Sequence, residues 1–201
     1  MESINFRIEK ASVKDYQLFA DIIQTVWENM PQKEWFMADN ADYTYQMLTS
    51  KKGIGYKAVQ ENSDKVVGVF MVVIPGMEKE NMGYDIGLNE IELPLVAHMD
   101  SVAILPQYRG HKLQYHLMQT AEADLKVQGF RYLMCTVHPD NYYSRNNVLD
   151  QGYQSMAIKE KYSGHLREIF FEKVKLTFNN RNFFFSDYIS MENKTINMNY
   201  K

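Results

Sequence analysis

A short basic turn at residues 107–112 has the residue types that bind an anion. It reads Gln-Tyr-Arg-Gly-His-Lys, so Arg109 and Lys112 place positive charge on either side of Gly110. A glycine lets the backbone approach a ligand with no Cβ in the way. Backbone N–H groups and two cations gathered at one turn would suit a phosphate or a pyrophosphate.

The residues on either side of this turn predict the elements that would position it. Residues 102–105 form a β-branched and apolar run that stops at Pro106, which predicts a strand. A turn that leads directly into a helix points unpaired N–H groups and the positive end of the helix dipole into one concavity. The alternative is an ordinary solvated turn, because one glycine with two basic neighbours is common. The helix is predicted from apolar residues at helical spacing, namely Leu113, Leu117, Met118, Ala121 and Leu125.

The turn resembles the Gln/Arg-x-x-Gly-x-Gly/Ala signature of the GNAT family of N-acetyltransferases. It matches the signature at Gln107 and Gly110 and departs from it at Lys112, where the family usually has Gly or Ala. Residues 104–110 are similar to the family's strand end, Val-x-Pro-Glu-Tyr-Arg-Gly, and Leu113-Gln114 continues like its helix start. The context of strand, turn and helix is the one that such a motif requires.

Further matches lie towards the C-terminus. Asn141, Ser144 and Gly152-Tyr153 are similar to the family's later pattern of an Asn, a small residue three positions on, and a Gly-aromatic pair. Together the matches extend from residue 4 to residue 174. The resemblance implies an α/β (α+β) fold, with a mixed, mostly antiparallel sheet of about six to seven strands, a central splayed parallel pair and flanking helices.

The resemblance also implies where acetyl-CoA would bind as a cosubstrate. In the family the central strand splays from its parallel neighbour, and the pantetheine pairs with freed backbone groups, here those of residues 102–104. One of those N–H groups can polarise the thioester carbonyl, as an oxyanion hole does. The residues expected to bind acetyl-CoA are Val102, Ala103, Ile104, Gln107, Arg109, Gly110, His111, Lys112, Leu113, Gln114, Asn141 and Ser144.

The residue that protonates the departing thiolate is not in its usual place. Family members commonly have a Tyr seven residues after the Asn of the later helix, but this position is Val148 here. Tyr142 and Tyr143 are near in sequence, and Tyr143 is the candidate to replace it.

Two residues are candidates for the base that deprotonates an amine. Strict alternation along the central strand puts Asp100 on one face with His98, Val102 and Ile104. His138 follows the neighbouring strand, where the splay should open. Either could relay a proton through water. The structural alternatives are a polar residue at a strand start for Asp100 and a cap of the following turn for His138.

Other chemistries have little support in the sequence. The five histidines do not occur at zinc-site spacings with Cys or acidic partners, so no metal is expected. Cys135 lies in an apolar run and is most simply a small buried hydrophobe. The sequence contains no Gly-x-Ser-x-Gly elbow, P-loop lysine motif or dinucleotide-binding glycine motif.

Composition sets the broad class of the protein. The chain has 201 residues, of which 45% are hydrophobic and 23% charged, which suits one globular domain. A formal net charge of −3 argues against a general nucleic-acid or anionic-membrane binder. The single cysteine cannot form an internal disulfide, and no apolar run reaches the roughly 20 residues of a membrane span. We therefore expect a cytoplasmic protein with neither nucleic acid nor membrane as a partner.

Periodicity predicts the other elements. Trp27, Trp35, Phe36, Tyr43 and Tyr45 form an aromatic set near the N-terminus, which is either core packing, the commoner case, or a substrate wall. The parallel pair is expected from the strand, helix, strand order around the turn. We expect strands at 4–10, 56–60, 65–74, 131–137, 154–159 and 168–174, a helix from the Ser12 cap to Pro31, a short helical piece at 42–48, and a helix from Asn141 to residue 150.

Two segments have weaker patterns. Residues 75–94 are rich in Gly and Glu, and we expect an insertion loop that is either a lid over the acceptor or a surface excursion with no role. Residues 175–201 contain six Asn and the run Phe183-Phe184-Phe185 with no clear period. We expect a GNAT-like domain at 1–174 and an Asn/Phe-rich appendage at 175–201.

The sequence as a whole favours one function and leaves one alternative. The favoured function is an N-acetyltransferase that moves an acetyl group from acetyl-CoA to an amine of a small molecule or peptide. The alternative is a catalytically silent acyl-CoA-binding sensor or scaffold, which Val148 and Lys112 favour. A homodimer is compatible with either.

Overall fold

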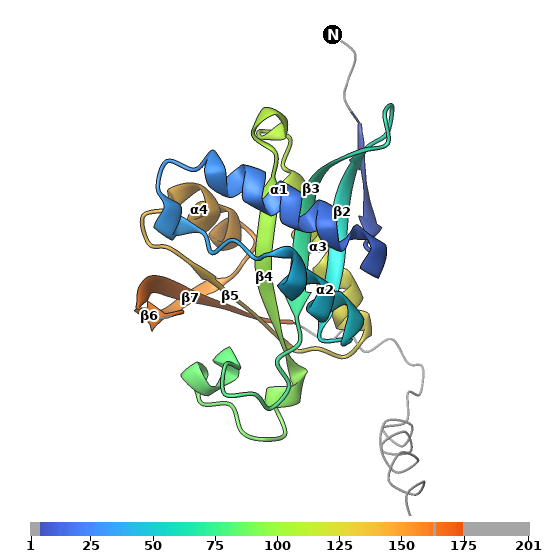
Figure 1. Cartoon of the computed structure of the whole chain (residues 1–201). Helices are drawn as coiled ribbons and strands as arrows, with labels where there is room; N and C mark the ends of the chain where they lie inside the picture. The colour runs from blue at the N-terminus through green and yellow to red at the C-terminus, as the bar shows by residue number, and fades with distance from the viewer. Residues whose placement is uncertain (1–4, 163, 175–201) are drawn as a thin grey trace, which may run out of the picture.

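The computed structural model describes residues 5–162 and 164–174 and is built around one sheet. Its strands are β1 (Phe6–Lys10), β2 (Gly53–Gln60), β3 (Lys65–Val73), β4 (Val96–Ile104), β5 (Tyr132–Val137), β6 (Gln154–Lys161) and β7 (His165–Lys173). They lie in the order β1-β2-β3-β4-β5-β7-β6 (Figure 1). Neighbouring strands are antiparallel except β4 and β5, which run parallel. The predicted fold class is confirmed.

In the described part of the chain, four α-helices cover the two faces of this sheet. Helices α1 (Tyr16–Glu28) and α2 (Ala41–Thr49) pack on one face, where apolar residues of α1 contact β3 and β4. Helices α3 (Leu113–Val127) and α4 (Tyr142–Asp150) pack on the other face with the largest core cluster. Both faces of the central strands are therefore buried, which explains why β3 is apolar along almost its whole length.

Local signals set several helix ends. Gly129 follows α3 with a φ of 92° and Gly152 follows α4 with a φ of 98°, left-handed conformations that suit glycine. The Asn141 side chain caps α4 by accepting the N–H of Ser144 at 3.3 Å. Ser12 begins a 3₁₀ turn ahead of α1, so the helix itself starts later than its predicted cap.

A β-bulge in β4 makes one prediction about Asp100 wrong. Consecutive residues of β3 pair with Met99 and Ser101, so Asp100 between them has no partner in the ladder. Such an extra residue shifts the alternation of side chains by one. Met99 therefore shares a face with Val102, whereas His98 lies on the other face, against the segment that precedes β4. Strict alternation had placed His98, Asp100 and Val102 together.

The parallel strands β4 and β5 pair over a short distance and then separate, as Figure 1 shows. Residues 96–98 of β4 pair with residues 132–134 of β5. Beyond them β4 continues to Ile104 and β5 to Val137 without pairing to each other. Backbone N–H and C=O groups on these facing edges have no partner strand. The predicted splay is thus present in the sheet.

Residues 75–94 pack on the sheet. They contain the 3₁₀ turn Met82–Ile86 and the start of a second one, Leu93–Leu95. Met82 is 2% exposed and packs with core residues of β4, β5 and β7. The buried Asn81 amide donates to the main-chain oxygens of Gly76 and Leu93, at 2.6 and 3.0 Å. None of these residues lines the large cavity described below, so the structure supports neither a lid nor a loop without a structural role.

Protonation of His98 is expected to weaken the fold. Its Nε2 accepts a hydrogen bond from the N–H of Met82 at 3.1 Å, which requires a neutral imidazole. Burial, helped by the positive charge of Lys161 and opposed by Asp85, lowers the pKa of His98 to about 4. The unfolded chain binds a proton at His98 more readily than the folded chain does. The contribution of neutral His98 to the free energy of unfolding is therefore complete above pH ~6.5 and is lost as the pH falls towards 4. It amounts to roughly 3 kcal/mol.

Urea unfolding at several pH values checks this prediction. The parent protein should lose more free energy of unfolding between pH 7 and pH 4.5 than His98→Gln, whose amide oxygen can accept the same hydrogen bond without titrating. His116→Gln, at an exposed position on α3, is the matched control and should follow the parent. Identical slopes for the parent and His98→Gln would contradict the prediction.

The predicted division of the chain stays a prediction. The last described strand, β7, ends at Lys173, close to the predicted boundary at residue 174. Residues 175–201, including the Phe cluster, lie outside the described residues, as does Ile4 at the predicted start of the first strand.

Candidate active site

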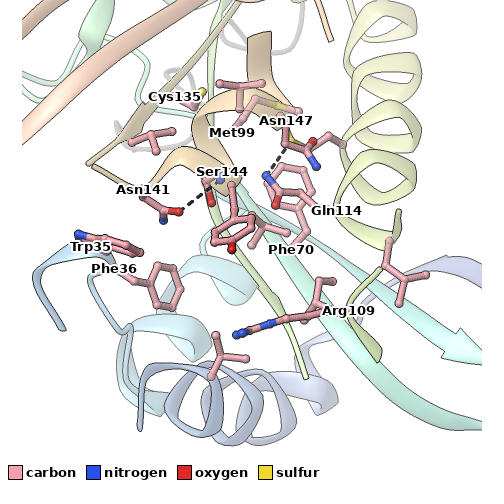
Figure 2. Close-up of a pocket in the computed structure, with 18 of the residues that line it drawn as sticks. Trp35, Phe36, Phe70, Met99, Arg109, Gln114, Cys135, Asn141, Ser144 and Asn147 are labelled. Atoms are coloured by element: carbon pink, nitrogen blue, oxygen red, sulfur yellow. Dashed lines mark hydrogen bonds between the residues drawn. The ribbon is translucent and has the colours of Figure 1, made fainter. Parts of the chain in front are cut away.

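A cavity of about 780 Å³ passes between the splayed strands. Its walls come from β4 and β5, from the basic turn and the start of α3, from α4, and from the connection between α1 and α2 (Figure 2). The lining residues include Val26, Met30, Pro31, Trp35 and Phe36; Met99, Asp100, Val102 and Ile104; Arg109, Gly110, Lys112, Leu113 and Gln114; Cys135, Thr136 and Val137; and Asn141, Tyr143, Ser144, Asn147 and Val148.

The basic turn forms one part of this cavity. Gly110 has a φ of 86°, and Lys112, the N-cap of α3, has a φ of 56°. No side chain caps α3, so the N–H groups of its first turn remain available. Arg109 and Lys112 both line the cavity beside them. The structure therefore brings together the N–H donors, helix dipole and cations that an anion needs.

Lys112 has a left-handed backbone, which suits glycine, one of the two residues usual at this position of the signature. A side chain with a Cβ is strained in this conformation by roughly 1–2 kcal/mol, whereas glycine is not. Lys112 keeps the conformation in spite of that strain.

A pair of carboxylates lies where β4 bulges. Asp100 lines the cavity, and Ser101 beside it is buried. The Ser101 hydroxyl donates to Asp39 Oδ2 at 2.6 Å, and its Oγ lies 3.3 Å from Asp100 Oδ2. One hydroxyl proton cannot serve both carboxylates. A protonated Asp100 could donate to the serine oxygen while the serine donates to Asp39, which would satisfy all three groups.

The surroundings of this pair favour that protonated form. Asp100 is exposed to the cavity, while the protein packed around it disfavours its charged form by desolvation. This desolvation, together with the negative charge of Asp39, raises the pKa of Asp100 to about 7. Desolvation also raises the pKa of Asp39, while the hydrogen bond from Ser101 opposes the shift. Each carboxylate that ionises makes ionisation of the other less favourable, so the two groups titrate as a pair.

A comparison with models of protein families shows which family the chain belongs to. Residues 19–153 match the model of the acetyltransferase (GNAT) family. The chain belongs to this family. The matched region spans every residue that lines the cavity, and the resemblance seen in the sequence is confirmed.

Solved acetyltransferase structures share the fold. An N-acetyltransferase from Staphylococcus aureus Mu50 has a TM-score of 0.65 at 13% identity, covering 85% of this chain and 99% of that one. The ribosomal-protein-S18-alanine N-acetyltransferase of Escherichia coli has a TM-score of 0.60 at 14% identity, with 89% and 100% covered. The Salmonella typhimurium protein yncA, solved with its cofactor acetyl-CoA, has a TM-score of 0.63 at 12% identity, with 89% and 98% covered. A comparison with curated protein sequences found no significant match.

Most of the residues predicted to bind acetyl-CoA line the cavity of this GNAT protein. Three do not. Ala103 faces the α1 side of the sheet, Gln107 is exposed, and the ring of His111 lies against Phe6 with 5.3 Å between centroids. Those that line the cavity are Val102, Ile104, Arg109, Gly110, Lys112, Leu113, Gln114, Asn141 and Ser144.

The three catalytic candidates are placed differently. Asp100 and Tyr143 line the cavity, with Tyr143 88% exposed near the start of α4. His138 is buried and does not line it; its Nδ1 accepts the N–H of Asp140 at 3.2 Å, and its ring stacks on Trp35. Val148, at the position where the resemblance implies a Tyr, is buried and lines the cavity. Asp100 therefore has access to the cavity, whereas His138 is turned away from it.

Sequence reasoning missed several residues of the site. Asp39 was not singled out, because it follows no periodic pattern and meets Ser101 only through the fold. The hydroxyls of Thr136 and Tyr162, 3.2 Å apart, were missed for the same reason. Of the aromatic set, Trp35 and Phe36 line the cavity, although core packing is the commoner role for such residues.

The described residues give no support for a cysteine nucleophile, a metal site or a membrane-spanning helix. Burial raises the pKa of the Cys135 thiol, which fits a buried hydrophobe better than a nucleophile. Within the described part of the chain, no three His, Cys, Asp or Glu side chains gather as a metal site would require. None of the helices described there has the length and apolar character to cross a membrane.

Proposed function

We propose that this chain is an N-acetyltransferase that moves the acetyl group of acetyl-CoA to an amine of a small molecule or peptide. The observation that carries the proposal is the continuity of the cavity, which joins the basic turn, the unpaired edges of the splayed strands and Asp100. Membership of an acetyltransferase family supports acetyl transfer. The amine as acceptor is supported by a carboxylate in the cavity whose pKa is suited to accepting a proton near neutral pH.

The residues present fit acetyl-CoA. The turn around Gly110 would hold the pyrophosphate through N–H groups, Arg109 and Lys112. The edge of β4 that faces away from β3, at residues 102–104, would pair with the amides of the pantetheine. When bound, acetyl-CoA supplies an acetyl group already activated as a thioester.

Groups of the chain would carry out the two proton transfers and the polarisation of the carbonyl. Asp100 would take a proton from the amine, and a main-chain N–H of β4 would polarise the acetyl carbonyl. Tyr143 would protonate the departing thiolate, since Val148 cannot. Its high exposure allows the phenol to swing towards the cavity that it lines.

Two measurements test this function. Calorimetry should show acetyl-CoA binding near its physiological concentration, and a screen of amines should release free thiol above the rate without amine. Binding without amine-dependent thiol release would instead support the silent sensor or scaffold. Absence of binding would contradict both. Cytoplasmic location, a homodimer and the absence of nucleic-acid and membrane partners stay predictions.

A further inference from the structure

The charged side chains that line the cavity are divided between two places. Arg109 and Lys112 belong to the turn before α3, and Asp100 lies at the bulge of β4. Among the described residues that line the cavity, no other side chain carries a formal charge. The cavity is therefore positive where phosphates are proposed to bind and negative at the bulge.

No cation of the described residues pairs with the negative charge at the bulge. None of the ion pairs formed within residues 5–162 and 164–174 includes Asp39 or Asp100. Ser101 ties the two carboxylates together and adds no positive charge. A desolvated carboxylate without a countercharge is unfavourable, and a cationic ligand relieves that cost.

The wall supplied by the connection between α1 and α2 is apolar. Val26, Met30, Pro31, Trp35 and Phe36 line the cavity from this connection and the end of α1. In Figure 2, Trp35 and Phe36 lie on the other side of the cavity from Gln114. An aromatic and aliphatic wall with a few placed polar groups is typical of a site for an apolar ligand body.

We propose that the acceptor is a primary amine with an apolar, preferably aromatic body and no carboxylate beside its nitrogen. This proposal rests on the proposed function and specifies its substrate class. The ammonium group would bind Asp100, with Asp39 adding negative charge through Ser101. A free α-amino acid would bring its own carboxylate towards Asp100 and Asp39, which would repel it. The only cations that line the described cavity belong to the basic turn, so none of them would offset this repulsion.

The reaction balances with these groups. One proton of the ammonium passes to the Asp100 carboxylate and later to solvent. The neutral nitrogen bonds to the acetyl carbon, and the carbon–sulfur bond breaks with its electron pair on sulfur. A second proton from the nitrogen ends on sulfur, through Tyr143 or water, and the third remains on the amide product.

Three matched amines test the proposal with the full chain. 2-Phenylethylamine, L-phenylalanine amide and L-phenylalanine share a ring and an amine, and only the last has a carboxylate. We expect kcat/KM, counted per ammonium form of each amine, to be at least about tenfold higher for the first two than for L-phenylalanine, since one like-charge contact near a protein surface is worth that much. Asp39→Asn should reduce this discrimination and leave acetyl-CoA affinity unchanged, which also shows that the variant folds.

The outcomes separate this inference from the proposed function. Equal kcat/KM for L-phenylalanine and its amide, or unchanged discrimination in Asp39→Asn, would overturn the inference. A third result would also overturn the inference: thiol release with other amines, but neither acetylation nor binding of the two carboxylate-free probes in the presence of acetyl-CoA. In these cases amine-dependent thiol release would leave the N-acetyltransferase function standing. Failure to bind acetyl-CoA would contradict the function itself.

Discussion

Asp100→Asn is expected to lower kcat/KM for amine acetylation by ~10²–10⁴, the range typical for loss of a positioned base. Asp100 is the carboxylate that lines the cavity, and the bulge of β4 holds it out of the strand ladder. Asparagine has nearly the same shape but cannot accept the proton of an ammonium group. The affinity for acetyl-CoA should change little, so the loss should fall on the amine-dependent rate.

The pH profile distinguishes a base from a merely structural residue. Because an ionised Asp100 is the active form, kcat/KM of the parent should rise with pH through an apparent pKa of about 7. Asp39→Asn removes the neighbouring negative charge that helps to raise this pKa, so the rising limb should move to lower pH. Asp100→Asn should lack the limb.

Asp150→Asn provides a matched control for this experiment. Asp150 is exposed at the end of α4 and does not line the cavity, so its variant should keep the parent's rate and pH profile. If Asp100→Asn also keeps both, Asp100 is not the base. The amine would then lose its proton to water, and the protein would contribute positioning and carbonyl polarisation alone.

The parts of the fold that were predicted correctly depend on local signals. The strand, the basic turn and the helix that follows are adjacent in sequence, and Pro106, Gly110 and Gly129 mark their limits. The turn's open helix start and its two cations at the cavity could be predicted because they depend on neighbouring residues alone; anion binding there stays a prediction. The same locality explains the correct prediction of the Asn141 cap.

The parts that were missed depend on contacts between distant residues. The bulge at Asp100 arises from how β4 pairs with β3. A prediction from strict alternation of side chains along a strand assumes that there is no extra residue. Strand β7 begins at His165, three residues before its predicted start, because exposed and charged positions near the hairpin hide the alternation. Asp39 reaches Ser101 across 62 positions of sequence, and no motif announces that contact.

Gly110→Asp is expected to weaken acetyl-CoA binding by ~10²–10³, because a carboxylate in the turn would repel the pyrophosphate and pair with the cations that should bind it. Gly110 has a φ of 86°, and a Cβ added there would meet no heavy atom within 4 Å, so the protein itself has room for the new side chain. Strain from the left-handed backbone is shared by Gly129→Asp, whose φ is 92° and whose Cβ also has free space. Gly129 follows α3 at its far end and lines no part of the cavity, so this control should bind acetyl-CoA like the parent.

Gly110→Asn separates the charge from the change of shape. Asparagine tolerates the left-handed conformation and carries no charge, so this variant should keep most of the affinity measured by calorimetry. If Gly110→Asp binds as tightly as the parent, the turn does not hold the pyrophosphate, and the continuity of the cavity no longer supports acetyl transfer. If Gly110→Asn loses as much affinity as Gly110→Asp, the close approach of backbone to phosphate, and not the positive charge of the turn, is what the site depends on.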